Sequence, residues 1–144
     1  MSERPSELSI IEFAQAVGRL VRRARAAGAD SGLSWTESSV LAWLAKLGPM
    51  TTAELARREG MKPQSMGTVT AGMEKMGLIV REPHATDGRR VNLVLTEKGA
   101  ELRKHTSETK RAWIAQRFAT LSEEEQRALF AAGKLMARLT EDSE

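Results

Sequence analysis

The chain has 144 residues, of which 41% are hydrophobic and 28% charged, and its formal net charge is +3. This length suits a single domain with its own core, and so small a net charge does not by itself indicate binding to a polyanion. The absence of cysteine excludes disulfides, thiolate metal ligands and thiol redox sensing, and no run approaches the roughly 20 apolar residues that span a membrane.

The N-terminal segment is predicted to form one amphipathic helix. The first residues, MSERPSELS, lack the apolar core of a signal peptide, so we expect a cytoplasmic protein. From about Ser6 to Ala27 the apolar residues recur mostly at steps of three and four, and GADSG then ends the helix. These residues are Leu8, Ile11, Phe13, Ala14, Val17, Leu20, Val21 and Ala24. We interpret the arginines of this helix as a solvated face, with nucleic-acid contact as the alternative.

A second helix is predicted over Trp35–Leu47. Ser34 and Glu37 have the Ser-x-x-Glu spacing of a capping box, in which both side chains bond free backbone amides at a helix start. The Gly-Pro pair that follows ends the helix. Trp35 and Trp43 are expected in the core or in an interface, and the alternative is that they line a ligand cavity.

Two short helices joined by a tight corner are predicted next. Thr51 and Glu54 repeat the capping-box spacing, so one helix begins there, and Gly60 ends it. Pro63 begins the following helix, because its fixed φ suits a first helical turn. The apolar residues of that helix are expected to share a core-facing side: Met66, Val69, Met73 and Met76. This arrangement is a helix-turn-helix.

The opposite face of the second of these helices carries the side chains that a DNA reader would use. Gln64 can pair with adenine through two hydrogen bonds, Ser65 and Thr68 can bond bases or phosphates, and the methyl group of Thr68 can touch a thymine methyl. A plain solvated face is the alternative. The phosphate contacts that we expect around this face come from Thr51, Thr52, Arg57, Arg58 and Lys62.

A basic β-hairpin follows the helix-turn-helix. A β-rich run at Leu78–Val80 and an alternating run at Val91–Leu95 flank EPHATDGR, a stretch with turn-forming residues. Arg89 and Arg90 lie at the tip of this wing, where an arginine can enter a minor groove. Asp87 is placed to hold an arginine by a charge-assisted bond. A solvent-exposed turn with incidental charge is the alternative.

Two more helices complete the chain. Thr96 caps a long helix, which includes Trp113 and Phe118, and Ser122 with Glu125 forms another capping box. The last helix carries an apolar stripe at heptad-like spacing: Leu129, Ala132, Leu135, Met136 and Leu139. Together with the first helix, this stripe offers more apolar surface than the small central module can cover. We therefore expect a homodimer with a twofold helical interface.

The predicted fold class is mainly α with a small β-wing (α+β). Residues 33–99 would form a winged helix-turn-helix lobe that binds DNA. Residues 6–28 and 100–142 would form a dimerisation base, and residues 1–144 would together make one domain.

The chain resembles the MarR family of bacterial transcriptional regulators over essentially its whole length. The segments that carry the resemblance are TAELARREGMKPQSMGTVTAGMEKMGLIVRE, the wing TDGRRVNLVLTEKG and the flanking helices. The resemblance implies a triangular homodimer that binds a pseudo-palindromic operator in double-stranded DNA, usually as a repressor. It also implies release of the DNA when a small effector, often aromatic or phenolic, binds between lobe and base.

The same resemblance assigns roles to individual residues. It places recognition-helix contacts on Gln64, Ser65 and Thr68, the minor-groove contact on Arg89, and the bracing role on Asp87. Sequence alone offers a set of candidates for an effector pocket, with no indication of which of them converge: Trp35, Trp43, His105 and Trp113.

Two other classes of function are alternatives to a DNA-binding regulator. A winged helix can serve as a protein-interaction module without DNA binding, because fold does not dictate function. An enzyme is not expected, since His84 and His105 lie far from any paired-carboxylate or metal-ligand motif and are expected to be exposed. No phosphate-binding glycine loop is present either, and neither a cofactor nor a metal is predicted.

Overall fold

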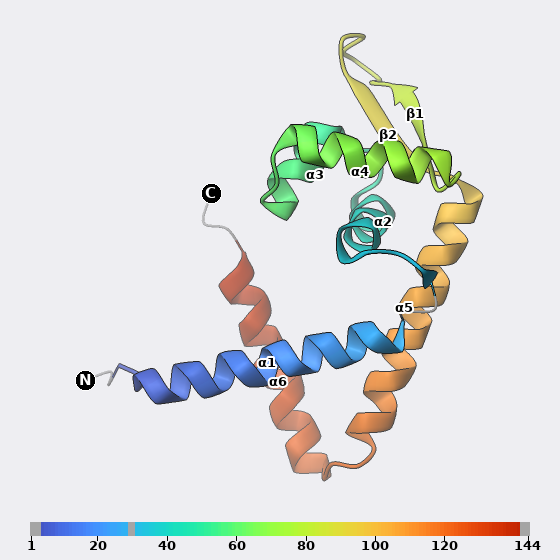
Figure 1. The fold of residues 1–144 in the computed structure, drawn as a ribbon. Helices are drawn as coiled ribbons and strands as arrows, with labels where there is room; N and C mark the ends of the chain where they lie inside the picture. The colour runs from blue at the N-terminus through green and yellow to red at the C-terminus, as the bar shows by residue number, and fades with distance from the viewer. Residues whose placement is uncertain (1–3, 29–30, 142–144) are drawn as a thin grey trace. The chain divides into compact units, whose positions relative to one another are not determined.

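The computed structural model describes residues 4–28 and 31–141. Helices predominate, and one small antiparallel sheet projects as a wing, so the predicted fold class is confirmed (Figure 1). In chain order the elements are α1 (Glu7–Ala27), α2 (Trp35–Leu47), α3 (Thr52–Glu59), α4 (Pro63–Lys75), β1 (Ile79–Pro83), β2 (Val91–Leu95), α5 (Glu97–Phe118) and α6 (Glu123–Thr140). Ala29 and Asp30 of the predicted GADSG break, and residue 142 of the predicted base, lie outside the described residues.

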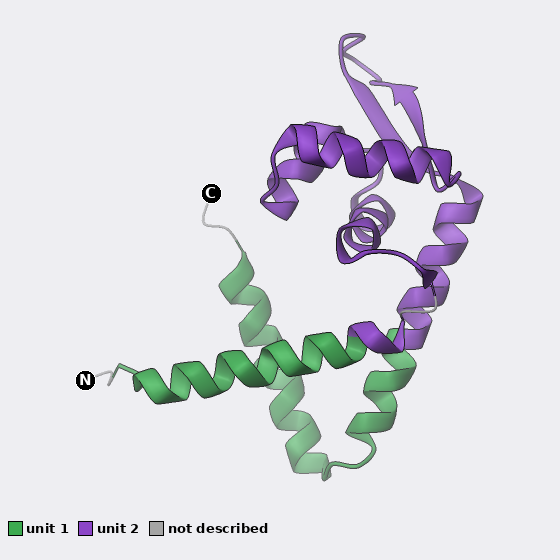
Figure 2. Cartoon of the chain, viewed as in Figure 1, with its two compact units in different colours: residues 1–24, 110–144 green, residues 25–109 purple. Residues whose placement is uncertain are grey.

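The chain forms two compact units (Figure 2). The first, which we call the base unit, comprises residues 1–24 and 110–144, and the second, the lobe unit, comprises residues 25–109. The lobe unit contains the complete helix-turn-helix and the wing. The base unit contains most of α1, the end of α5 and all of α6.

The helix starts follow the predicted capping boxes. In α3, the backbone N–H of Glu54 donates to Thr51 Oγ1 at 3.2 Å, and the N–H of Thr51 donates to Glu54 Oε2 at 3.1 Å. The same reciprocal pair forms at the starts of α2 and α6, through Ser34 with Glu37 and through Ser122 with Glu125. Each pair satisfies two backbone amides that a helix start otherwise leaves without a partner.

The core of the lobe unit is built where α2, α3, α4 and the sheet meet. Its buried apolar side chains are Val40, Leu41, Leu44, Met50, Leu55, Ala56, Met66, Met73, Leu78, Ile79 and Leu93. The prediction for Met76 was wrong, because α4 ends at Lys75 and Met76 is an exposed cap residue. Thr70, one turn after Met66, is fully buried instead, and its hydroxyl donates to the Gly67 carbonyl oxygen at 3.2 Å.

The wing is attached to the lobe by a third extended segment that the sequence pattern did not reveal. β1 and β2 pair antiparallel, with Ile79 opposite Leu95 and Pro83 opposite Val91. On its other side Leu93 bonds to Met50, just before α3: the Leu93 N–H donates to the Met50 carbonyl at 2.7 Å, and the reverse bond is 3.3 Å. These bonds join the wing to the start of the helix-turn-helix.

The start of α5 packs tightly against the turn that precedes β1. Thr96 accepts the backbone N–H of Gly99 at 3.1 Å through its hydroxyl, which confirms the predicted N-cap. Gly99 is buried, and a Cβ added there would lie 2.1 Å from the carbonyl oxygen of Leu78. Only glycine therefore lets the helix approach this backbone so closely.

The base unit leaves large apolar side chains exposed. Neither α1 nor α6 buries a residue, and the exposed fraction reaches 64% for Leu8 and 81% for Leu139. The rings of Phe118 and Phe130 pack 5.2 Å apart and line a mainly apolar cavity of about 490 Å³ between α5 and α6. Among the described residues, no helix is long and apolar enough to cross a membrane.

Candidate nucleic-acid interface

The outer face of α4 presents the three predicted recognition residues together. Gln64, Ser65 and Thr68 are all exposed, and Met66 and Met73 on the opposite side are fully buried. The Thr68 hydroxyl donates to the Gln64 carbonyl oxygen at 3.3 Å and keeps its lone pairs free to accept. Helical spacing places residues three and four apart on one side, so these side chains form one polar surface.

The start of α4 leaves backbone amides for an external partner. Lys62 occupies the N-cap position without a side-chain cap bond, and Pro63 is the first helical residue. Lys62 itself is exposed. A helix start with uncapped amides and a nearby cation is a favourable place for a phosphate.

Two of the other residues that are predicted to contact phosphate, Thr51 and Arg58, already have partners within the protein. At the start of α3 the amide and the hydroxyl of Thr51 are both engaged with Glu54, and Thr51 is 7% exposed, whereas Thr52 is half-buried. Arg57 is exposed. The guanidinium of Arg58 lies 4.8 Å from the centre of a ring of Trp43 and stacks over it.

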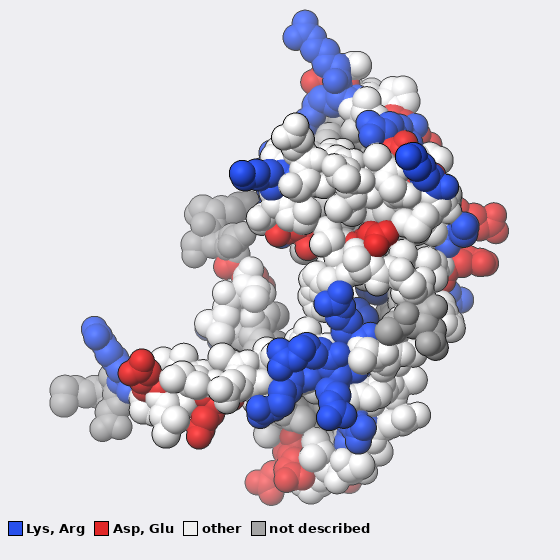
Figure 3. Space-filling view, in the orientation of Figure 1, with Lys and Arg blue, Asp and Glu red and all other residues white. Residues whose placement is uncertain are grey.

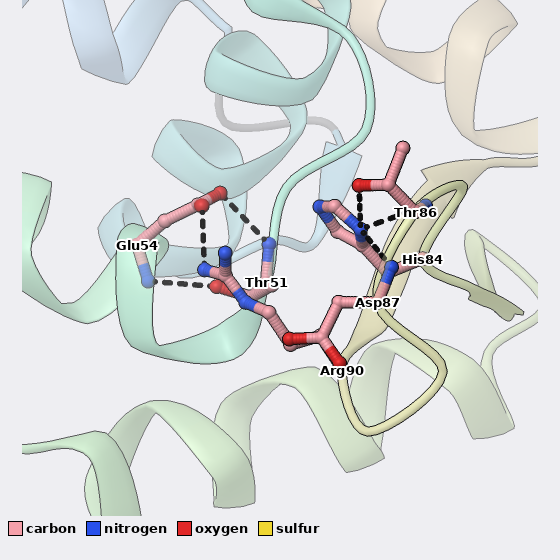
Figure 4. A network of polar contacts seen from close by, with 6 residues as sticks. All are labelled: Thr51, Glu54, His84, Thr86, Asp87 and Arg90. Atoms are coloured by element: carbon pink, nitrogen blue, oxygen red, sulfur yellow. Dashed lines mark hydrogen bonds and ion pairs between the residues drawn. The ribbon is translucent and has the colours of Figure 1, made fainter.

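The wing is tied to α3 by an ion pair (Figure 4). Nη2 of Arg90 donates to Oε1 of Glu54 at 3.0 Å, so Arg90 is directed toward the helix-turn-helix. Within the described part of the chain, Arg89 makes no ion pair and its side chain is exposed. Lys and Arg side chains gather at the end of the wing in Figure 3. The structure thus gives the two arginines different roles.

Asp87 does not hold an arginine side chain, and that prediction was wrong. Its Oδ1 accepts the backbone N–H of Arg89 at 3.0 Å, and its carbonyl oxygen accepts the backbone N–H of Arg90 at 3.0 Å. The short Asp87-Gly88-Arg89 turn brings the Arg89 amide to the carboxylate, as an aspartate at the start of a turn commonly does. Asp87 therefore shapes the backbone that carries Arg89.

His84 lies inside the wing loop and is half-buried, whereas full exposure was expected. Its Nδ1 accepts the backbone N–H of Thr86 at 3.3 Å and that of Asp87 at 3.2 Å. Its own backbone N–H donates to the Arg90 carbonyl at 3.0 Å, which closes the loop. His105 on α5 is exposed as expected.

The candidate pocket residues lie in separate local settings. Trp43 lines a cavity of about 280 Å³ in the lobe unit, with Ser39, Ala42, Lys46, Glu59 and Arg103 as the other walls. Its Nε1 donates to Glu59 Oε1 at 2.8 Å. Trp35 lies under the guanidinium of Arg25, and Trp113 in the base unit lies beside Arg117. No group of three or more potential metal ligands occurs among the described residues.

Sequence reasoning missed the second role of Glu54 and the role of His84. A capping glutamate uses one carboxylate oxygen on the helix start, so its other oxygen is available for a second partner. Sequence spacing does not reveal which group bonds this second oxygen, because Arg90 is 36 positions away from Glu54. For His84, the local signal is its position directly before the turn-forming residues of the wing loop, where its ring nitrogen can accept the backbone amides that follow.

Comparisons with known proteins identify relatives of this sequence and of this fold. A model of the MarR family matches residues 33–91. The HTH-type transcriptional regulator Mb0904 of Mycobacterium bovis is 39% identical over 132 residues, which cover 92% of each chain. The HTH-type transcriptional repressor Mb2911 of the same organism is 33% identical over 112 residues, 77% of this chain and 81% of the relative. A crystal structure of NadR in complex with 4-hydroxyphenylacetate, 22% identical, shares the fold with a TM-score of 0.74 and covers 99% of both chains.

Proposed function

The chain belongs to the MarR family of transcriptional regulators, and from that premise we propose that it is a repressor that binds a specific site in double-stranded DNA. The observation that carries the proposal is the pairing, on one lobe, of an exposed polar face on α4 with a wing whose exposed Arg89 makes no ion pair in the part of the chain that the structure describes. Such a lobe reads two grooves at once.

Within this proposal each exposed group has a distinct task. Gln64, Ser65 and Thr68 read base edges in the major groove, and Arg89 enters the neighbouring minor groove. Asp87 supports Arg89 through the backbone, and Arg90 supports the wing through Glu54. Phosphate contacts that carry no sequence information come from Thr52, Arg57 and Lys62, with smaller shares for Thr51 and Arg58, whose groups already have partners.

The proposed assembly is a homodimer. A single chain leaves the apolar sides of α1 and α6 exposed, including Phe13, Leu20 and Phe130 at half exposure or more. Groups of exposed large apolar side chains are typical of protein–protein interfaces. A second copy covers them most simply, because a twofold axis brings the same surface from both chains together. Two recognition helices would then lie about 34 Å apart, one turn of DNA, over a pseudo-palindromic operator.

The proposed effector site is the cavity lined by Trp43. The cavity combines an indole with the cations Lys46 and Arg103, and its volume of about 280 Å³ suits a small aromatic acid or phenol. The structurally similar NadR is described with 4-hydroxyphenylacetate. The other three candidates for an effector pocket do not line this cavity: Trp35, His105 and Trp113.

The test is selection of bound sequences from a random pool of DNA duplexes, followed by titration of the winning duplex at several salt concentrations. A pseudo-palindromic consensus is expected. The logarithm of the binding constant should fall linearly with the logarithm of salt concentration, with a slope of roughly −0.9 for each phosphate contacted. Salt-dependent binding without an enriched sequence would contradict a specific operator, and no binding to any duplex would instead favour a winged helix that serves a protein interaction.

A further inference from the structure

The loop between β1 and β2 is built around one atom, Nδ1 of His84. Two consecutive backbone amides, those of Thr86 and Asp87, donate to it at 3.3 and 3.2 Å. Thr86 Oγ1 lies 3.4 Å from the same nitrogen. Figure 4 shows the imidazole directed into the loop toward both residues. The amide of Asp87 is thus fixed by the imidazole, and the carboxylate of Asp87 in turn fixes the amide of Arg89 at 3.0 Å.

This geometry requires one form of the imidazole. A nitrogen that accepts from two N–H donors must keep its lone pair, so the ring is neutral and carries its proton on Nε2. Protonation of Nδ1 would place a third N–H against the two backbone donors and leave them without an acceptor. Protonation of the imidazole therefore removes the acceptor on which the loop depends.

We propose that His84 is a positioning residue for DNA binding, and that its neutral imidazole holds the wing loop in the conformation that presents Arg89. The inference rests on the proposed function, since its consequence is read in operator affinity. His84 acts through the backbone of residues 86–89 and contacts no DNA itself. Acidification that protonates His84 therefore loosens the wing and weakens operator binding.

The neighbouring charged groups do not give the same response. The loop itself contributes Asp87, Arg89 and Arg90, β1 contributes Glu82, and α3 contributes Glu54 through its pair with Arg90. As chemical classes, carboxylates lose their charge at lower pH than an imidazole gains one, and guanidinium groups stay charged throughout. An imidazolium that merely added charge near DNA would strengthen attraction to phosphates on acidification, which is opposite in sign to the loss expected here.

The decisive experiment measures operator affinity from pH 7.5 to 5.5 at fixed salt for the full chain and for two matched variants. His84→Asn keeps an acceptor in place, because an asparagine side chain bonds the backbone amide two residues on, but it cannot be protonated. His105→Asn changes the only other histidine, which is exposed on α5. Wild type and His105→Asn should each lose affinity by roughly fivefold or more on acidification, as expected for the loss of one or two neutral hydrogen bonds. His84→Asn should show a flat profile.

A second measurement follows the loop without DNA. In nitrogen-15 NMR at pH 7.5 the His84 ring should show a bare Nδ1 and a protonated Nε2, and the amide protons of Thr86 and Asp87 should exchange slowly. Their protection factors, which are the intrinsic exchange rates at each pH divided by the observed rates, should fall on acidification in wild type and not in His84→Asn. A proton on Nδ1 at pH 7.5 overturns the inference.

The outcomes separate the two proposals. Wild type that binds its operator with a pH profile equal to that of His84→Asn overturns the role of His84 and leaves the proposed function standing. Wild type that binds no duplex at any pH overturns the proposed function, and the NMR measurement then decides the role of His84 in the loop.

Discussion

The carboxylate of Glu54 lies 3.0 Å from the guanidinium of Arg90 and connects the wing to the start of α3. Its other oxygen accepts the backbone N–H of Thr51, so one side chain caps a helix and anchors a hairpin. The anchor fixes the base of the wing loop beside the helix-turn-helix. Of the two wing arginines, Arg89 is therefore the one whose exposed side chain makes no ion pair among the described residues.

The first prediction measures this ion pair. Both side chains are partly exposed, at 43% for Arg90 and 33% for Glu54, so solvent screens the attraction. A double-mutant cycle with Glu54→Gln and Arg90→Gln should give a coupling free energy of unfolding of about 0.2–1 kcal/mol. Glutamine preserves the capping box, so the cap is not lost along with the charge. Coupling that does not shrink in 1 M salt would contradict an ionic origin.

The second prediction concerns Arg89. Replacing Arg89 with Ala should weaken operator binding by at least about tenfold at fixed salt. The slope of the logarithm of the binding constant against the logarithm of salt concentration should become shallower by about 0.9, the contribution of one neutralised phosphate. Dimerisation should be intact. Lys104→Ala removes an exposed cation from α5 and serves as the control. Equal operator affinities of the two variants in a mobility-shift titration would show that Arg89 does not contribute to DNA binding.

The third prediction tests the dimer. Leu20 on α1 is 50% exposed in the single chain, and a glutamate there would have to enter the proposed interface. Leu20→Glu should raise the dimer dissociation constant by roughly a hundredfold, because two buried leucines and their transfer free energies are lost. Leu47→Glu on α2, 47% exposed, is the control. Sedimentation that finds wild type monomeric at every concentration would refute the assembly.

The fourth prediction concerns Gly99. A Cβ there would lie 2.1 Å from the Leu78 carbonyl oxygen, and a backbone atom cannot move aside as a flexible side chain can. Gly99→Ala should therefore lower the free energy of unfolding by roughly 1–3 kcal/mol. Gly67→Ala on α4 meets nothing within 4 Å and should raise it by up to about 1 kcal/mol through helix propensity. Denaturant titrations of both variants decide the matter, and a neutral Gly99→Ala would show that α5 can shift.

The features that sequence predicted well are those set by near neighbours. A capping box needs only residues three apart, so Ser34, Thr51 and Ser122 marked helix starts that the structure confirms. Spacing within α4 likewise separated the polar surface of Gln64 and Ser65 from the buried methionines. Met76 was misplaced because spacing does not reveal where a helix stops.

Only the tertiary structure decided the partners that lie far apart along the chain. Sequence supplied Glu54 and Arg90, Met50 and Leu93, and Leu78 and Gly99, but nothing local pairs them. Their meeting depends on how the helices and the hairpin pack around a shared core, which follows from all the buried side chains together. The sequence by itself determined a helix-turn-helix with a basic wing. The packing decided that Arg90 pairs with Glu54, whereas the exposed Arg89 makes no ion pair with another described residue.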